Sequence, residues 1–259
     1  MMALRGRGLV AVVVVLVLAW CAFEGVQGSQ PSPLPLPRPP SKATQTGVFF
    51  PYICSKEITL SKIKVTQSER MYIQYVEYVA AIPHLTSFTL HYWFNLADTT
   101  NTSTMLNYEY EPSFPKNLLT VQLANEKGKQ GQQQYWVMRL NGVLVSREAM
   151  HPPIRRGEWR HALHSWDAHT GVITHYIDGH LYKARTVYES KEWLIPAGGV
   201  AVSGQHHSAV TQGAGMDQGE GLNGWLTLLQ LSSKPIGASP EDAALAKLAA
   251  QCPRKLRGT

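Results

Sequence analysis

Apolar residues recur at every second position through much of this chain. This period of two restricts the folds that the chain can adopt more than any other feature of the sequence. In FTLHYWF, residues 88–94, the alternate positions are apolar and share one face: Phe88, Leu90, Tyr92 and Phe94. Successive side chains point to opposite faces of a strand, whereas a helix repeats every 3.6 residues. The pattern therefore predicts β-strands with one buried face.

Turn signals separate these alternating stretches. Asn141-Gly142 and Asp178-Gly179 each lie between two of them, and their residues tolerate the positive φ of a tight hairpin turn. The expected strands are residues 88–94, 135–140, 143–147, 159–166, 172–177, 180–187, 200–204 and 224–231. Because no helix is expected between them, the sequence predicts an all-β fold of two antiparallel sheets packed as a sandwich.

One helix is expected near the C-terminus. Ser239 begins the sequence SPED, a capping box with proline at the first helical position, and strong helix formers follow over residues 243–251. This helix would carry Cys252, the residue after it, towards Cys54.

The two ends of the chain lie outside this domain. Basic residues, a short apolar run over residues 9–22 and small residues at positions −3 and −1 of a cleavage after Gly28 predict a signal peptide, residues 1–28, although an uncleaved anchor is the alternative. Residues 29–47 are a proline-rich linker, 48–253 the folded domain and 254–259 a basic tail. We expect a secreted protein with no membrane span after cleavage.

Cys54 and Cys252 are the cysteines of the expected mature chain. Two thiols in an oxidising compartment usually pair, and a bridge between them would be worth roughly 5 kcal/mol. It would also require the two ends of the domain to lie side by side. The alternative is that the two cysteines link separate subunits.

The formal charge of +6 is scattered along the chain. A nucleic-acid or heparin site needs basic residues gathered on one face, and no such clustering with aromatic residues is present. We expect no nucleic-acid partner.

Histidines are concentrated in residues 159–179. His161 and His164 are three positions apart on one expected strand, so they point to opposite faces and cannot hold one metal ion together. His175 is on the neighbouring strand and His169 in the turn between them. Without cysteine or carboxylate partners at zinc spacing, these residues are expected to be ordinary sheet histidines.

The same segment resembles a known family. HALHSW, with His161, Ser165 and Trp166, is similar to the pentraxin signature His-x-Cys-x-Ser/Thr-Trp. YIDG, VSGQ, GWLTLLQL and SPED follow in the order of similar pentraxin motifs, and FTLHYWF resembles an early one. The resemblance covers most of residues 58–251. It implies the lectin-like jelly roll of concanavalin A-like, laminin G-like and pentraxin domains, in which the terminal strands meet.

The chain departs from the family pattern at two functional features. His91 and Leu163 occupy the two positions of the family's internal disulfide, so that bridge is absent. The family's calcium site uses acidic and amide side chains from two loops, and the positions that match them are Asn117, His206, His207, Ser208, Asp217 and Glu220. Retained calcium binding, a transition metal held by His206 and His207 with the two acids, and a solvated loop all remain open.

Asn101 begins an N-glycosylation sequon, Asn-Thr-Ser, in a polar stretch over residues 98–104 that we expect to be a loop. Glycosylation at Asn101 is the expected modification.

Catalysis is not expected. A jelly-roll glycosidase needs paired carboxylates on one face. Glu109 and Glu111 share a face but are followed at once by Pro112, and Glu189 and Glu192 fall on opposite faces. Both mature cysteines are assigned to a structural role.

Two functions remain open. The first is a secreted recognition module that binds glycans or cell-surface and microbial ligands, with doubtful calcium dependence and with assembly into homo-oligomers suggested by the resemblance. The second is a metal-free structural or adhesive module that contacts proteins, such as an ectodomain fragment of a longer receptor. The same fold hosts both functions.

Overall fold

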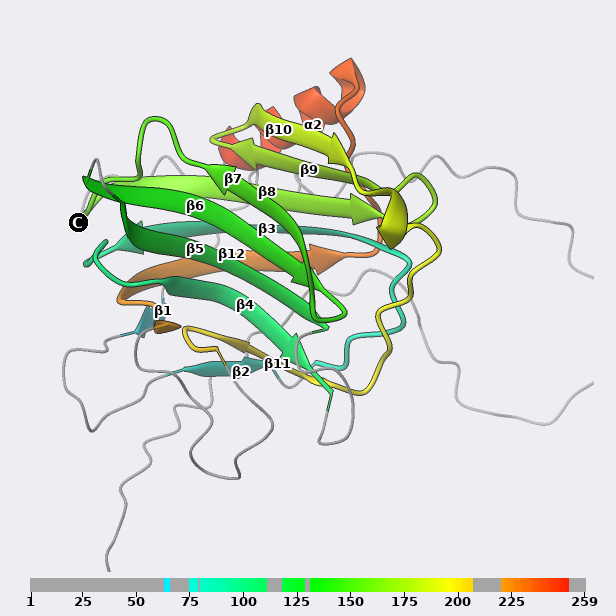
Figure 1. Cartoon of the computed structure of the whole chain (residues 1–259), viewed down its shortest axis with the longest axis horizontal. Coiled ribbons are helices and arrows are strands. Elements are labelled where there is room, and N and C mark those ends of the chain that lie inside the picture. Colours follow the sequence, from blue (N-terminus) through cyan, green and yellow to red (C-terminus); the bar gives the residue numbers. More distant parts are fainter. Residues whose placement is uncertain are drawn as a thin grey trace, which may run out of the picture.

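The computed structural model of the chain describes residues 63–65, 75–78, 80–110, 118–128, 131–206 and 220–251. Within these ranges the protein is a sandwich of two six-stranded sheets (Figure 1). The elements are β1 (Ile63–Val65), β2 (Val76–Tyr78), β3 (Ser87–Leu96), β4 (Ser103–Glu109), β5 (Leu119–Gly128), β6 (Gly131–Leu140), β7 (Val143–Ala149), β8 (Trp159–Asp167), β9 (Val172–Ile177), β10 (His180–Thr186), η1 (Tyr188–Ser190), β11 (Val200–Ser203), β12 (Gly224–Ser232) and α2 (Pro240–Gln251).

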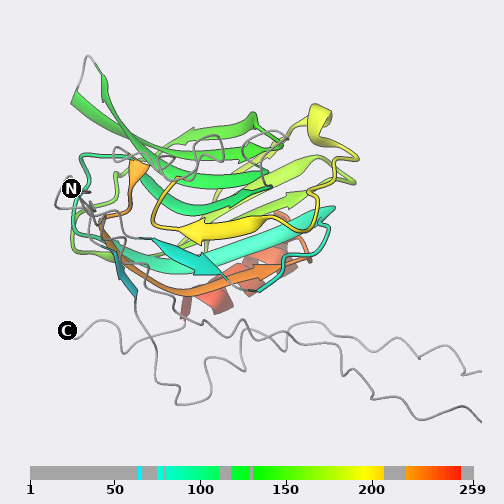
Figure 2. The same ribbon diagram turned by 90° about the horizontal axis from the view of Figure 1, so that it is seen from below.

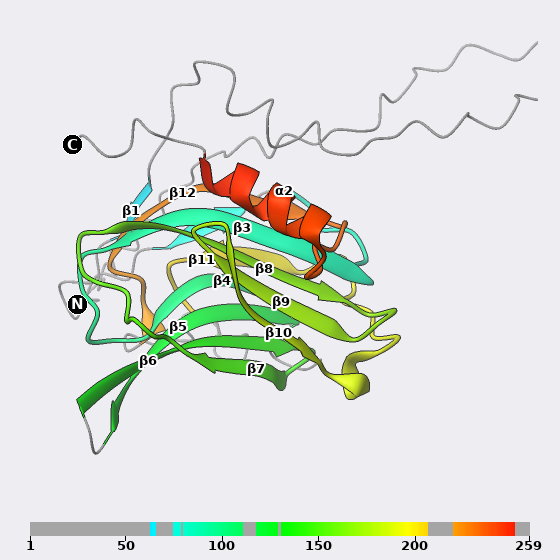
Figure 3. The same ribbon diagram turned by 90° about the horizontal axis from the view of Figure 1, so that it is seen from above.

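Every strand pairs antiparallel with its neighbours. Sheet A has the order β1-β12-β3-β8-β9-β10, and sheet B has the order β2-β11-β4-β5-β6-β7. The two sheets form two layers, and α2 lies outside sheet A (Figures 2 and 3). The predicted two-sheet jelly-roll sandwich with one C-terminal helix is confirmed.

The core lies between the sheets and follows the period-two pattern. On β3, Phe88, Leu90, Tyr92, Phe94 and Leu96 have no exposed surface and point into it. They meet Val121, Leu123, Trp136 and Met138 of sheet B in the same cluster. Burial of apolar surface at roughly 25 cal/mol per Å² makes this layer the main source of stability.

Four strands were missed by sequence reasoning: the short β1 and β2, and the longer β4 and β5. β4 and β5 lie in the middle of sheet B, and β4 begins at Ser103, inside the stretch that we expected to be a loop over residues 98–104. Ser103 and Thr104 are buried. The loop prediction is therefore wrong for these two residues, because pairing with β5 and burial outweigh their polarity.

The hairpin turns form where predicted. Asn141 and Gly142 have φ values of 49° and 80°, and Asp178 and Gly179 have 50° and 78°, as expected for tight hairpin turns. Gly179 has a second role, because a Cβ there would lie 2.7 Å from the Cα of Lys247 in α2. The β9–β10 turn can approach the helix only because this residue has no side chain.

The cap of α2 also forms as predicted. Ser239 Oγ accepts a hydrogen bond from the backbone N–H of Asp242 at 3.1 Å, and the Ser239 carbonyl accepts one from Ala243 N–H at 2.9 Å. The helix buries Ala246 against Leu163 and Tyr176 on the outer face of sheet A. A small apolar cluster thus fixes the helix to the sheet.

The first and last strands of the described part lie side by side. β1 pairs with β12 through Ile63–Leu226, Lys64–Trp225 and Val65–Gly224. This agrees with the expected meeting of the domain's ends. Cys54 and Cys252 lie outside the described residues, so their pairing stays a prediction, as do the boundaries of the signal peptide, linker, domain and tail.

Candidate functional site

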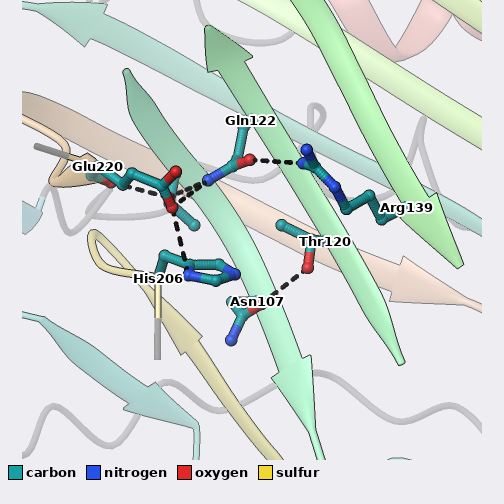
Figure 4. Close-up of polar contacts among 7 residues, drawn as sticks. Asn107, Thr120, Gln122, Arg139, His206 and Glu220 are labelled. Carbon is teal, nitrogen blue, oxygen red and sulfur yellow. Dashed lines mark hydrogen bonds and ion pairs between the residues drawn. The ribbon is translucent and has the colours of Figure 1, made fainter. Parts of the chain in front are cut away.

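The candidate site lies on the outer face of sheet B, where His206 and Glu220 come together (Figure 4). His206 follows β11 and Glu220 precedes β12. His206 Nδ1 lies 3.2 Å from Glu220 Oε2, and their side chains retain 21% and 34% of their exposure. The structure therefore joins two of the six residues that the family resemblance assigned to a metal site.

Gln122 of β5 connects this pair to the sheet. Its Nε2 donates to Glu220 Oε2 at 3.0 Å and to Thr104 Oγ1 at 3.0 Å, while its Oε1 accepts from Arg139 Nη1 at 3.1 Å. Thr104 Oγ1 donates in turn to the Glu220 carbonyl at 2.8 Å. Because a guanidinium only donates and a carboxylate only accepts, the orientation of the Gln122 amide is fixed.

A second polar pair lies beside this network on the same face. Thr120 Oγ1 donates to Asn107 Oδ1 at 2.8 Å, and both side chains are fully buried. The register places Asn107 of β4 opposite Thr120 of β5, and Thr120 opposite Arg139 of β6. Three adjacent strands therefore present a polar row where sequence alternation alone indicates solvent-facing positions.

The arrangement can bind a polar ligand through its partly exposed members. Glu220 offers an acceptor, while His206 and Arg139 add a donor and a cation a short distance away (Figure 4). The buried amide of Gln122 holds these groups in place without becoming exposed. Preorganised groups of this kind lower the entropy cost of binding.

The described residues do not fit calcium. Calcium prefers six to eight oxygen ligands, whereas Glu220 Oε2 faces the Gln122 amide N–H and an imidazole nitrogen. Within the described ranges, no group of three His, Cys, Asp or Glu side chains could hold a metal ion. Asn117, His207, Ser208 and Asp217 lie outside the described residues, so their expected roles are not tested.

The positions of the missing family disulfide face each other. His91 of β3 and Leu163 of β8 are direct partners in the register. Leu163 instead packs in the cluster under α2, and His91 Nε2 hydrogen-bonds Gln230 Oε1 at 3.1 Å. The substitution thus replaces a covalent link with packing and one polar contact.

The signature residues serve the scaffold. Trp166 has no exposed surface, packs against Phe88 and donates from Nε1 to Ser190 Oγ at 3.1 Å. Ser165 Oγ donates to the Phe88 carbonyl at 2.8 Å and accepts from Ile236 N–H at 2.9 Å. Ser165 therefore ties the segment before α2 to sheet A.

The histidines of residues 159–179 lie as the alternation predicted, with His161 and His164 on opposite faces of β8. Sequence reasoning missed that both are fully buried and that each meets another histidine. His161 Nε2 lies 3.4 Å from His91 Nδ1, and His164 Nδ1 lies 2.7 Å from His175 Nδ1. The signal is the register, which pairs His164 with His175 directly, and no single strand shows it.

Burial controls the ionisation of these imidazoles. It lowers the pKa of His91 and of His175 to about 4; the hydrogen bond that His91 donates to Gln230 Oε1 acts against it at His91, and the charge of Arg185 adds to it at His175. Burial also lowers the pKa of His161 and His164 well below the usual value, and a neighbouring histidine adds to the effect in each case. All four are neutral at pH 7.

The carboxylates weighed for catalysis do not form an accessible pair in the described residues. Glu109 is 3% exposed on β4, and Glu111 lies outside the described ranges. Glu189 is in the short helical turn η1 and Glu192 has φ of 60°, so they do not belong to one strand as the sequence argument assumed.

Asn101 is exposed at the bend before β4, where its carbonyl accepts a hydrogen bond from Asn125 at 2.6 Å. An exposed bend suits a glycan, and glycosylation remains a prediction. No helix in the described ranges is long and apolar enough to cross a bilayer.

Comparison with solved structures identifies the class of fold. The structure matches a heptameric SAP-like pentraxin from Limulus polyphemus with a TM-score of 0.59 and 18% identity, over 73% of this chain and 81% of that one. It also matches the extracellular region of zebrafish Gpr126/Adgrg6 with a TM-score of 0.50 and 15% identity, over 68% of this chain and 22% of that one.

No family model and no curated protein matches the chain. The likeness is therefore one of fold. The protein has a divergent pentraxin-like, laminin G-like fold, as the order of its motifs indicated.

Proposed function

We propose that this protein is a secreted, non-catalytic recognition module that binds an extracellular glycan or cell-surface ligand without calcium. The proposed contact face is the outer side of sheet B around Glu220, His206 and Arg139. The observation that carries the proposal is the His206–Glu220 contact at 3.2 Å, held by Gln122.

The position of this contact supports a binding role. It occupies two positions that resemble calcium ligands of the pentraxin family, so the face used for recognition would be retained while its chemistry changes. Donors from the protein meet the carboxylate of Glu220 in place of a cation. A polar ligand can then exchange hydrogen bonds with the partly exposed side chains directly.

Thermal unfolding tests the metal dependence. A ligand that binds only the folded state raises the Tm by mass action. We expect the same Tm in calcium and in EDTA. A calcium-dependent rise that disappears in Glu220→Gln would contradict calcium-free recognition, and a rise with zinc alone would indicate a site that includes His206.

Retention on immobilised glycans and on phospholipid vesicles tests the face. We expect Glu220→Gln to lose retention roughly tenfold, since a charge-assisted hydrogen bond contributes about 1.5–3 kcal/mol. Glu126→Gln is the matched control, because Glu126 is an acid on the same sheet that pairs with Arg147 at 2.7 Å outside the network. Equal retention by the two variants would contradict the proposed face.

A second candidate function, protein adhesion, is favoured by one observation. Val143, Leu144 and Leu194 are each nearly half exposed, and Asn141 Nδ2 bonds the Leu194 carbonyl at 3.2 Å, which brings the β6–β7 turn next to Leu194. Exposed apolar groups of this kind suit a protein partner or another copy of the chain. Protein capture that persists in Glu220→Gln but fails in Leu144→Ser would favour adhesion.

A further inference from the structure

A chain of hydrogen-bonded side chains crosses the interior of the sandwich. Tyr92 OH lies 2.9 Å from His164 Nε2, His164 Nδ1 lies 2.7 Å from His175 Nδ1, and His175 Nε2 lies 2.8 Å from Ser146 Oγ. Ser146 Oγ donates to Glu148 Oε1 at 3.4 Å, and Arg185 Nη1 donates to the same oxygen at 3.5 Å. We call the five linked groups from Tyr92 to Glu148 the relay.

The relay joins the two sheets at one side of the sandwich. Tyr92, His164 and His175 belong to β3, β8 and β9 of sheet A, whereas Ser146 and Glu148 belong to β7, the edge strand of sheet B. Its four inner members have at most 1% exposure, and the Trp136 ring meets His164 edge-on with centroids 4.7 Å apart. Water therefore cannot replace a lost hydrogen bond there.

The protons of the relay can be placed in one consistent order. If Tyr92 donates to His164 Nε2, His164 donates from Nδ1 to His175 Nδ1, and His175 donates from Nε2 to Ser146. Ser146 then donates to Glu148, so every inner group has a partner. In the reverse order Tyr92 accepts from His164, and its own hydroxyl proton is left without an acceptor in the relay.

An added proton breaks this order. The Nδ1 atoms of His164 and His175 face each other, so they can share one hydrogen but cannot both carry one. A proton taken up by His175 turns His164 to the other tautomer and deprives the Tyr92 hydroxyl of its acceptor. A second proton places two N–H groups against each other in a buried space, which separates the rings.

We propose that the relay is an acid-sensitive latch that holds β7 against β9 and releases this side of the sandwich when its histidines are protonated. The other polar contacts between these edges are partly exposed: the Glu148–Arg185 pair and the Tyr182 hydroxyl, which donates to the Ala149 carbonyl and accepts from His151 N–H at 3.0 Å. Val145 of β7 also lies in the buried apolar cluster that includes Ile173 and Ile177 of β9. Once the relay breaks, β7 keeps its ladder with β6 and the buried Val145 but loses its buried polar link to β9.

The groups around the relay determine how readily its histidines take up a proton. Arg185 on β10 opposes a charge on His175 and itself donates to Glu148 on β7, and Tyr92 on β3 is neutral because burial raises its pKa well above the usual value. His161, on the opposite face of β8, opposes a charge on His164. Both relay histidines have a lowered pKa in the closed state, so protonation and opening occur together and acid shifts the equilibrium towards the open state.

Amide hydrogen exchange measured between pH 7.5 and pH 4.5 tests the latch. After correction for intrinsic exchange, we expect β7 to lose protection relative to the β4–β5 ladder below about pH 6, by up to about tenfold per pH unit for each proton taken up on opening. In His175→Gln, whose amide can still donate to Ser146 but does not titrate, the pH dependence of the ratio should fall by one proton, because only His164 is left to take one up.

Two further variants complete the test. His91→Gln removes a buried histidine from the other face of sheet A and should keep the pH response of β7. Ser146→Ala cuts the relay at β7 and should expose β7 already at pH 7.5, with little further change in acid.

The proposal is overturned if β7 and β5 lose protection together in the unaltered protein, or if His91→Gln reduces the pH dependence of β7 as much as His175→Gln does. If His175→Gln does not fold, NMR titration of the unaltered protein decides. Titration of His164 and His175 at their ordinary pKa without a change at β7 would overturn the latch.

Discussion

The outer faces of the two sheets are built from the same alternation but are used differently. On sheet A the outward residues Leu163 and Tyr176 are covered by α2, and His91 and His161 are buried beside them. On sheet B the outward residues are polar, and Gln122 links Glu220 to Arg139. The outer face of sheet A therefore contributes to stability, whereas the outer face of sheet B carries the polar network that we propose as the binding face.

Acid should affect sheet A most. His91 and His175 have a pKa of about 4 in the folded protein and an ordinary value of 6.5 when unfolded. The contribution of these neutral histidines to the free energy of unfolding is complete above pH 6.5. It is lost as the pH falls from 6.5 to 4, since the unfolded chain binds the protons more strongly. Each of the two histidines should lower the free energy of unfolding by about 3 kcal/mol across that pH range.

Urea unfolding at several pH values measures this loss. The control is His91→Gln, which should reduce the loss by one histidine. A free energy of unfolding that is constant from pH 6.5 to pH 4 would contradict the neutral, buried state of these histidines and with it the assignment of stability to sheet A.

Restoring the family disulfide should strengthen sheet A. His91 and Leu163 are directly opposite, and opposed residues in antiparallel strands have Cα atoms about 4.5–5.5 Å apart, within disulfide range. In His91→Cys/Leu163→Cys, closing a loop of roughly 70 residues is worth about 4 kcal/mol, less about 2 kcal/mol of lost packing. Unfolding with and without reductant measures the gain in the free energy of unfolding. Failure of the two cysteines to form a bridge would argue against the direct pairing of residues 91 and 163.

Loss of the helix cap should have a smaller effect on the same face. In Ser239→Ala the Asp242 N–H loses its acceptor, and we expect a loss of about 1 kcal/mol in the free energy of unfolding. The exposed Ser233→Ala is the control. An unchanged stability would show that α2 is held by its contacts with Leu163 and Tyr176 alone.

The smallest stability effect is expected on sheet B. Glu220→Gln removes a partly exposed ion pair with His206, and such pairs contribute about 0–1 kcal/mol. We expect a change below about 1 kcal/mol by urea unfolding, together with the loss of binding proposed above. A loss of several kcal/mol would mean that the network on sheet B is structural and that the two faces do not differ in role.

Sequence reasoning found the strands whose alternate residues are large and apolar. It missed those in which the difference in polarity between inward and outward residues is less clear. β3, β8 and β9 were predicted within a few residues at each end. β4 was missed because its outward residues Asn107 and Glu109 are polar yet buried. In β5 the alternation of Leu119, Val121 and Leu123 was a usable signal that lay between unassigned segments.

The site was less predictable than the fold. The family resemblance pointed to His206 and Glu220, but nothing in the sequence marks Gln122 or Arg139, which look like solvent-facing residues of two strands. Their roles depend on which strands are neighbours and on their register. The pairing of His164 with His175 was hidden for the same reason.

The glycines of the described turns should differ in the substitutions that they accept. At Gly131 an added Cβ meets nothing within 4 Å, so a replacement costs backbone strain alone. At Gly179 the same atom would collide with the backbone of α2 at Lys247, so a replacement must also displace the helix. In a library that varies every position and is sorted for folded protein, Gly179 should come back unchanged while Gly131 returns with asparagine and aspartate among its survivors.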